Sequence, residues 1–390
     1  MNANVEGHKH LREGFTTGSA AAAAAKAATI FALMAETGAA VPTSVDVPPP
    51  SSAPASQPRL VIPIADVFDE GMSVRAVVIK DGGDDPDATH GARIEAVVTV
   101  DPAFSGVGPH VLIDGGPGVG RVTLPGLPVP VGKAAINPGP EGQIRAAVLE
   151  ALPEYFKGIV LVLIEVPEGE RIAQHTLNPR LGIVGGISIL GTGGIVRPYS
   201  HAAWAAAVSQ SLDVARAQGH KLCVCTTGRR TERFFMARNP AVPEVCCVQA
   251  ADHFAHALAE AAAKGFTTVV WSVFFGKLVK QAQGFASTHA RAAELNFSLL
   301  AEWAGQAGAT GPAVKAVALA NTAMEAYALL GKEGAGVRER LITDLVARAK
   351  KAAQGFGPGL CVLYHVYDLA DESGQVRLYA DELPGPYAGG

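Results

Sequence analysis

The stretch KLCVCTTGRRTE, residues 221–232, carries an apolar strand, a glycine turn and the start of a helix. A short apolar run followed by Gly and a polar helix start is typical of a strand buried in a sheet. Strands and helices also alternate around this stretch, with predicted strands over 183–190, 244–248 and 267–274 and predicted helices over 200–217 and 252–264. Such alternation predicts a parallel sheet covered by helices, with ligands bound beyond the carboxyl ends of the strands. A final strand pair is predicted over 360–367 and 376–379.

Before this alternating region, predicted helices and strands follow one another without a regular order. We expect a helix through the alanine run after Ser19, strands over 73–80, 92–100 and 159–166, and a helix over 143–156. This pattern indicates an α+β domain over residues 1–175, followed by an α/β domain over residues 176–390. Residues 41–60 are rich in Pro and Ser, which predicts an exposed, extended insertion, of which about residues 48–58 are expected to be mobile and dispensable.

Composition restricts the possible partners. The chain of 390 residues has a formal net charge of −4, so it offers no overall attraction for nucleic acid or anionic lipid. Its five cysteines lack metal-ligand spacing and are expected to be reduced thiols. Lys26 interrupts the apolar run over 20–35, which is therefore expected to be a folded helix and not a signal peptide. These features predict a cytoplasmic protein without a nucleic-acid or membrane partner.

Two glycine-bearing turns are candidates for a nucleotide-like cofactor. The Gly191–Gly194 turn is expected between a strand and a helix, where backbone N–H groups can approach a ligand, although a simple tight turn is the alternative. The turn after residue 226 occupies the corresponding place one strand later, so we expect both to meet in one crevice. The cofactor-binding candidates are Gly185, Gly186, Gly191, Thr192, Gly193, Gly194, Thr226, Thr227 and Gly228.

Three other patterns have both a chemical and a structural interpretation. The helix start at Thr16–Ser19, with Lys26 two turns along, is either an anion cradle or a well-capped core helix. The acidic segment 80–91 could bind a cation or keep one carboxyl protonated, or it could be an ordinary Asp/Gly/Pro turn. His253 and His256 are three residues apart, but no third ligand is evident, so a packing or surface role is favoured. No metal site is predicted.

Several long motifs carry a resemblance to a known family: GFTTGSAAAAAAKAA, KDGGDDPDATHG, GRVTLPGLPVPVGKAAINP, NPRLGIVGGISILGTGGIV, TTGRRTE and GKLVKQAQGFASTHA. The chain resembles the cobalt-precorrin-5B C1-methyltransferases of anaerobic cobalamin biosynthesis. The resemblance implies an S-adenosylmethionine-dependent enzyme that methylates carbon 1 of cobalt-precorrin-5B to give cobalt-precorrin-6A. It also implies an N-terminal domain similar to domain 2 of ribosomal protein S5 and a C-terminal Rossmann-like domain.

The implied reaction and substrate suggest roles for individual residues. Methyl transfer needs alignment and exclusion of water rather than a protein nucleophile, and the sequence shows no nucleophile–base pair. The catalytic candidates are Asp84, Asp85, Asp87 and His90. Because the cobalt-bearing tetrapyrrole carries many carboxylates, the substrate-binding candidates are Thr16, Thr17, Gly18, Ser19, Lys26, Asn137, Arg180, Arg197, Arg229, Lys277 and Lys280.

The chain departs from the family pattern at three places. Ser19-Ala20 replaces Thr-Cys, Ser272–Phe275 replaces a Gly-His before GKLVK, and Gly193 stands where a second threonine is commoner. No thiol at the first place and no histidine at the second can therefore be essential here. A non-catalytic tetrapyrrole-binding protein and another nucleotide-using transferase are the alternative functions, and homo-oligomerisation stays open.

Overall fold

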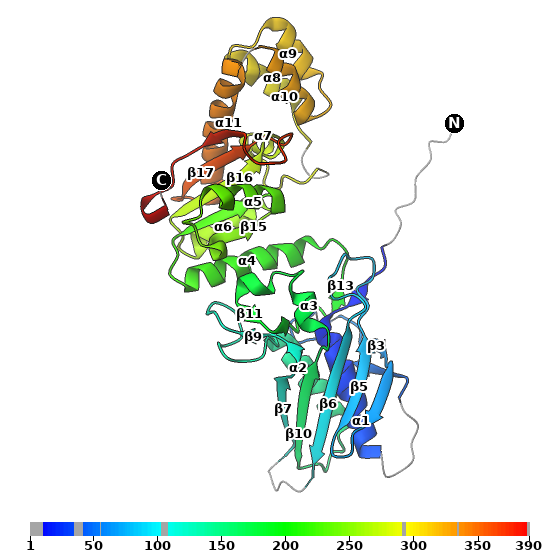
Figure 1. Cartoon of the computed structure of the whole chain (residues 1–390). Helices are drawn as coiled ribbons and strands as arrows, with labels where there is room; N and C mark the ends of the chain where they lie inside the picture. Colours follow the sequence, from blue (N-terminus) through cyan, green and yellow to red (C-terminus); the bar gives the residue numbers. More distant parts are fainter. Residues whose placement is uncertain are drawn as a thin grey trace, which may run out of the picture. The chain divides into compact units, whose positions relative to one another are not determined.

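The computed structural model describes residues 11–34, 42–54, 56–102, 108–290, 294–333 and 335–387. The fold is a mixed α/β one, and the chain divides into two compact units, Met1–Ser200 and His201–Gly390 (Figure 1). The predicted boundary after residue 175 lies before this division. Residues 176–200 belong to the first unit because their short strands pair with strands of that unit.

The first unit is built on a five-stranded mixed sheet. In spatial order its strands are β4 (Asp66–Asp69), β5 (Val74–Ile79), β6 (Arg93–Asp101), β10 (Ile159–Glu165) and β7 (His110–Gly115). Neighbouring strands are antiparallel except β10 and β7, which are parallel. The predicted strands over 73–80, 92–100 and 159–166 are thus confirmed as β5, β6 and β10.

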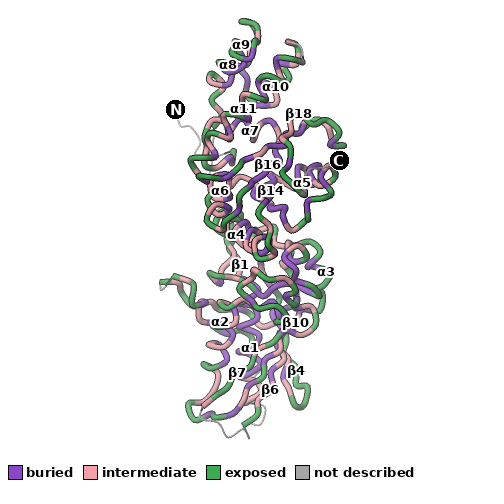
Figure 2. The backbone as a smooth tube through the Cα atoms, turned by 90° about the vertical axis from the view of Figure 1, so that its left-hand side faces the viewer, coloured by how far each residue is buried: buried purple, intermediate pink, exposed green. Residues whose placement is uncertain are grey.

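Helix α1 (Thr17–Met34) is the core helix of this unit. It contacts β5, β6 and helix α2 (Pro138–Ala151), and its alanines from Ala20 to Ala28 are fully buried (Figure 2). Small side chains allow this close approach of helix and sheet. Although α1 is long and apolar enough to cross a membrane, 72% of that window is buried in the protein, as in a core helix.

Short strand pairs complete the first unit. They are β1 (Gly14–Phe15) with β13 (Ile195–Val196), β8 (Gly118–Val119) with β12 (Gly186–Ile187), β9 (Arg121–Val122) with β11 (Ile183–Val184), and β2 (Ser44–Val47) with β3 (Leu60–Pro63). The segment also contains helix α3 (Gly169–Ala173) and a 3₁₀ turn over Asn178–Leu181. The prediction of one long strand over 183–190 is wrong, because two short strands there pair with different partners.

The second unit is built on the predicted parallel sheet. Its strands, in spatial order, are β15 (Cys247–Gln249), β14 (Leu222–Thr226), β16 (Thr268–Phe274), β17 (Cys361–Tyr367) and the antiparallel β18 (Arg377–Ala380). From β14 the chain first adds β15 on one side and then β16 on the other. The direction of winding therefore reverses between β14 and β16.

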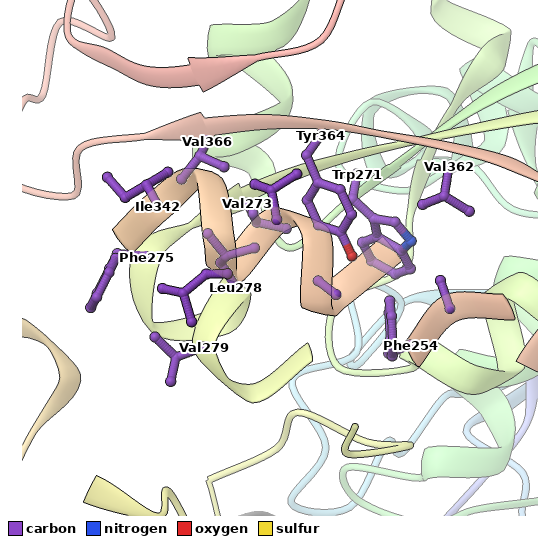
Figure 3. Packing of buried hydrophobic residues seen from close by; sticks show 14 of the residues in the cluster. Phe254, Trp271, Val273, Phe275, Leu278, Val279, Ile342, Val362, Tyr364 and Val366 are labelled. Carbon is purple, nitrogen blue, oxygen red and sulfur yellow. The ribbon is translucent and has the colours of Figure 1, made fainter. Parts of the chain in front are cut away.

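Alternate residues of these strands are buried against different helices. Leu222 and Val224 pack with Phe235 in one cluster, whereas Cys223, Cys225 and the adjoining helices form the larger one. In that larger core Trp271 of β16 pairs in register with Tyr364 of β17 and packs on Phe254, at 5.2 Å between ring centroids (Figure 3). The helices are α4 (His201–Ala217), α5 (Arg229–Arg238), α6 (Phe254–Ala263), α7 (Phe275–Ala282), α8 (Phe297–Gln306), α9 (Gly311–Ala318), α10 (Ala323–Leu330) and α11 (Ala335–Phe356).

Candidate functional site

The Gly191–Gly194 turn contacts the start of α1 in the first unit. The Gly18 amide donates to the Leu190 carbonyl at 3.1 Å, and the Ser19 hydroxyl donates to the Gly194 carbonyl at 2.9 Å. At Gly191, whose φ is +138°, a Cβ atom would come closer than 3.0 Å to the Thr16 side chain. The close approach of the helix start therefore accounts for Gly191 without a ligand, whereas a Cβ atom at Gly193 would have nothing within 4 Å.

The same contacts explain the helix start at Thr16–Ser19. Thr16, Thr17 and Ser19 are buried, and the Thr16 amide donates to the Gly194 carbonyl at 3.0 Å. The Thr17 hydroxyl accepts from the Leu190 amide at 2.9 Å. The donors expected to cradle an anion are therefore occupied by the glycine turn, and the capped core helix is the interpretation that the geometry favours.

The Pro/Ser-rich insertion covers this turn and is not the free loop that its composition predicts. The Ser52 hydroxyl donates to the Thr192 carbonyl at 2.7 Å, and the Gln57 side chain donates to the Gly193 carbonyl. Two of its residues, Val45 and Val47, are buried in the core of the unit. Sparse apolar residues at alternate positions of β2 were enough to anchor the segment.

The acidic segment forms a hydrogen-bonded turn. Asp84 accepts from the Arg12 amide at 2.7 Å, Asp85 accepts from the Tyr199 amide at 2.8 Å, and Asp87 pairs with the buried Lys80 ammonium at 2.5 Å. Burial works to raise the pKa of Asp87, but Lys80 and the Thr89 hydrogen bonds outweigh it and lower that pKa. This direction is opposite to that expected for a carboxyl group kept protonated. The His90 Nδ1 atom accepts from the Gly82 amide at 3.0 Å.

The remaining candidates of the first unit have structural contacts or lie apart from one another. Lys26 is buried and pairs with Asp46 at 3.2 Å and with Glu150 at 2.9 Å, so its charge is already compensated. Asn137 precedes α2, and its amide donates to the Ile189 carbonyl. Two arginines complete the set: Arg180 is half-buried in the 3₁₀ turn, and Arg197 is exposed and pairs with Glu13 at 3.2 Å. The glycines Gly185 and Gly186 adjoin this turn, and Gly186 lies against Gly118.

A different group of candidates meets at the carboxyl end of the parallel sheet in the second unit. Thr226 ends β14, and Thr227 donates its amide and its hydroxyl to the Ser272 carbonyl of β16, at 3.3 and 3.4 Å. Gly228 precedes α5, and a Cβ atom there would have nothing within 4 Å. This is the point at which the winding reverses, the usual place for a ligand in such a sheet.

Cationic side chains lie beside this point. Arg229 is exposed at the start of α5. Lys277 on α7 pairs with Asp252, and the ammonium of Lys280 donates to the Thr288 carbonyl at 3.1 Å. Burial lowers the pKa of Lys280. We call Arg229, Lys277 and Lys280 the basic edge.

Sequence reasoning did not single out Asp252, Thr288, His201 or His289, which the structure brings to the basic edge. The Thr288 hydroxyl donates to Asp252 at 2.9 Å, and the ring of His201 contacts that of His289. Thr288 and His289 belong to the motif GKLVKQAQGFASTHA, which was the sequence signal that could have identified them. The expectation that Gly191–Gly194 and Thr226–Gly228 share one sheet edge is wrong, because only the latter follows a strand of the parallel sheet.

Comparison with known proteins identifies the family. The CbiD family matches residues 4–198, and the CbiD C-terminal domain matches residues 287–376. A cobalt-precorrin-5B C(1)-methyltransferase of Nitratidesulfovibrio vulgaris is 51% identical, over 92% of this chain and 91% of its own length. This chain belongs to the CbiD family. A cobalt-precorrin-5B C(1)-methyltransferase of Geobacillus kaustophilus is 45% identical, over 94% of this chain and 94% of its own length.

A solved structure of the CbiD family is also similar. It is the cobalamin biosynthesis protein (CbiD) of Archaeoglobus fulgidus, which is 27% identical, with 83% of this chain and 85% of that chain covered and a TM-score of 0.36.

Proposed function

We propose that this chain transfers a methyl group from S-adenosylmethionine to carbon 1 of cobalt-precorrin-5B, giving cobalt-precorrin-6A in anaerobic cobalamin biosynthesis. The observation that carries the proposal is the identity of 51% over nearly the whole chain with a relative of that activity. The five described cysteines are free thiols, which is consistent with a cytoplasmic setting.

We further propose that the second unit is Rossmann-like and that the first unit is similar to domain 2 of ribosomal protein S5. The strand order β15-β14-β16-β17-β18 corresponds to 2-1-3-4-5, one of the two common doubly wound orders. For the first unit the support is its α+β composition, with two helices packed on a mixed sheet.

The cofactor site that we propose is the crevice at Thr226, Thr227 and Gly228. S-adenosylmethionine, when bound, supplies the methyl group as an electrophile. The residues fit a nucleoside-bearing ligand because Gly228 leaves open space beside the backbone and the first turn of α5 presents N–H groups there. Gly191 and Gly194 are left out of this site because protein groups lie against them, and Thr192 and Gly193 because Ser52 and Gln57 donate to their carbonyls.

The basic edge is the proposed holder of the substrate. A precorrin carries acetate and propionate groups around its ring, whereas the chain has a net charge of −4, so its binding requires local cations. Arg229 is exposed and Lys280 donates to the Thr288 carbonyl, so these two supply the cationic charge, while Lys277 is held beside them by the carboxylate of Asp252. Contacts of this kind orient the ring.

Transfer of a labelled methyl group tests the function. Purified protein, S-adenosylmethionine labelled in the methyl group and a cobalt-precorrin-5B preparation should give labelled pigment and S-adenosylhomocysteine in equal amounts. A tetrapyrrole carrier would bind the pigment and leave it unlabelled. A transferase that uses another nucleotide would leave the pigment unlabelled and would form no S-adenosylhomocysteine.

A further inference from the structure

Four histidines gather beside the basic edge of the second unit. His201 begins α4, His253 directly precedes α6, His256 lies in its first turn, and His289 follows Thr288. The His201 ring centroid is 5.8 Å from that of His253 and 5.6 Å from that of His289, and the His253 and His256 centroids are 6.2 Å apart. All four therefore belong to one cluster at the carboxyl end of the sheet.

The cluster is not built as a resident metal site. Over the described ranges of the chain, no group of three His, Cys, Asp or Glu side chains is arranged to hold a metal ion. A protein that keeps its own metal needs three or four ligands. A metal that arrives within a macrocycle needs only one, because the ring nitrogens already fill its equatorial positions.

His253 is the member best placed to act as such a ligand. His256 is oriented by the Ala205 carbonyl, 3.0 Å from its Nε2 atom. The ring nitrogens of His253 and of His201 have no hydrogen-bond partner among the described residues, and of these two rings His253 is half-buried whereas His201 is exposed. Burial, together with neighbouring His201 and His256, lowers the pKa of His253. A lowered pKa favours the neutral ring, which is the form that coordinates metals.

We propose that His253 is the axial ligand of the cobalt ion in the tetrapyrrole substrate. The inference rests on the proposed function, since the cobalt comes with the substrate. The imidazole nitrogen donates its lone pair to a vacant or water-occupied axial position, so that at most a water molecule leaves and no electron is transferred. The basic edge holds the carboxylates at the rim of the same ring.

Electron paramagnetic resonance of cob(II)yrinic acid, a cobalt corrinoid with free carboxylates and without a base of its own, tests the assignment. A nitrogen-14 ligand splits the cobalt lines of the bound complex into triplets. The wild-type protein should show these triplets, and protein labelled with nitrogen-15 histidine should show doublets instead. Triplets that persist after labelling, or no nitrogen splitting at all, would overturn the proposal without requiring any variant to fold.

Paired variants then identify the residue. His253→Gln should abolish the splitting and weaken cob(II)yrinic acid binding by about tenfold or more, which corresponds to ~1.4 kcal/mol. His256→Gln, three positions along, should retain it. Loss of splitting in His201→Gln but not in His253→Gln would refute the assignment to His253.

The methyl-transfer assay separates this inference from the proposed function. Wild-type turnover without nitrogen splitting would mean that the ligand assignment fails and the reaction stands. Nitrogen splitting without any methyl transfer would mean that the protein binds cobalt corrinoids through histidine but is not the proposed methyltransferase.

Discussion

Substitution of Gly191 by Ala tests whether the glycine turn of the first unit is scaffold or cofactor site. At a φ of +138° a non-glycine residue costs on the order of 1–3 kcal/mol. Because the new Cβ atom would also overlap the Thr16 side chain, overpacking adds about 1–3 kcal/mol. Together these give about 2–6 kcal/mol, a large part of the ~5–15 kcal/mol typical of a folded domain.

Gly193→Ala is the matched control, since nothing lies within 4 Å of its Cβ position. Its effect on stability should be under about 1 kcal/mol in either direction. Urea unfolding measures the stabilities, and calorimetry measures the affinity for S-adenosylhomocysteine. We expect Gly191→Ala to lower the unfolding midpoint and to keep the affinity of the folded protein unchanged. Equal midpoints for the two variants, or a tenfold loss of affinity in folded Gly193→Ala, would refute the scaffold interpretation.

Three further predictions concern other residues. Gly228→Val should weaken S-adenosylhomocysteine binding at least about tenfold, or ~1.4 kcal/mol, in calorimetry with little change in unfolding midpoint, because only open space surrounds that position; an unchanged affinity would place the cofactor elsewhere. The Asp87 carboxylate has a lowered pKa in the folded state, so its stabilisation is present above the unfolded pKa of about 3.9 and is lost as pH falls through the folded value. Asp87→Asn should therefore lower the free energy of unfolding by about 3–5 kcal/mol at pH 7, because it leaves Lys80 buried without its partner. Urea titrations should also show that the free energy of unfolding of this variant changes less with pH below pH 4 than that of the wild type, and an unchanged pH dependence there would contradict the prediction. Arg229→Ala should weaken pigment binding by up to about tenfold in fluorescence quenching titrations, less at raised salt because the side chain is exposed, and should spare S-adenosylhomocysteine binding; equal losses for both ligands would remove it from the basic edge.

The parallel sheet of the second unit was predictable because its strands are continuous apolar runs. Residues 222–226 and 268–274 are buried almost throughout, so both faces of each strand carry apolar side chains. The sequence therefore marks them as interior strands between helices. The order of the strands also follows from right-handed crossovers, once the reversal between β14 and β16 is known.

The first unit was less predictable because its contacts join distant parts of the chain. The Leu190 amide meets the hydroxyl of Thr17, which is 173 positions earlier in the sequence. Local spacing made Gly191–Gly194 resemble a strand-to-helix ligand turn, whereas the neighbour that requires Gly191 is the Thr16 side chain just before α1. The hydrogen bond between Ser52 and Thr192 could not be predicted from composition for the same reason, because the two residues are far apart in the sequence.

The sequence indicated which residues form the candidate site, but it did not indicate which of them lie together. The turn at Thr226–Gly228 and the basic residues Arg229, Lys277 and Lys280 could be named from glycine spacing and charge. Their neighbours Asp252 and Thr288 meet only because α6 and the segment after α7 lie side by side, which no local pattern indicates.

The position of the transferred methyl group is the most direct test of the central claim. S-adenosylmethionine carrying carbon-13 in its methyl group would be incubated with cobalt-precorrin-5B and the purified protein, and the product examined by carbon-13 NMR after removal of cobalt. We predict one enriched methyl signal, coupled to a quaternary ring carbon assigned as carbon 1. Enrichment at any other carbon, or an unlabelled product with S-adenosylmethionine unconsumed, would contradict the account.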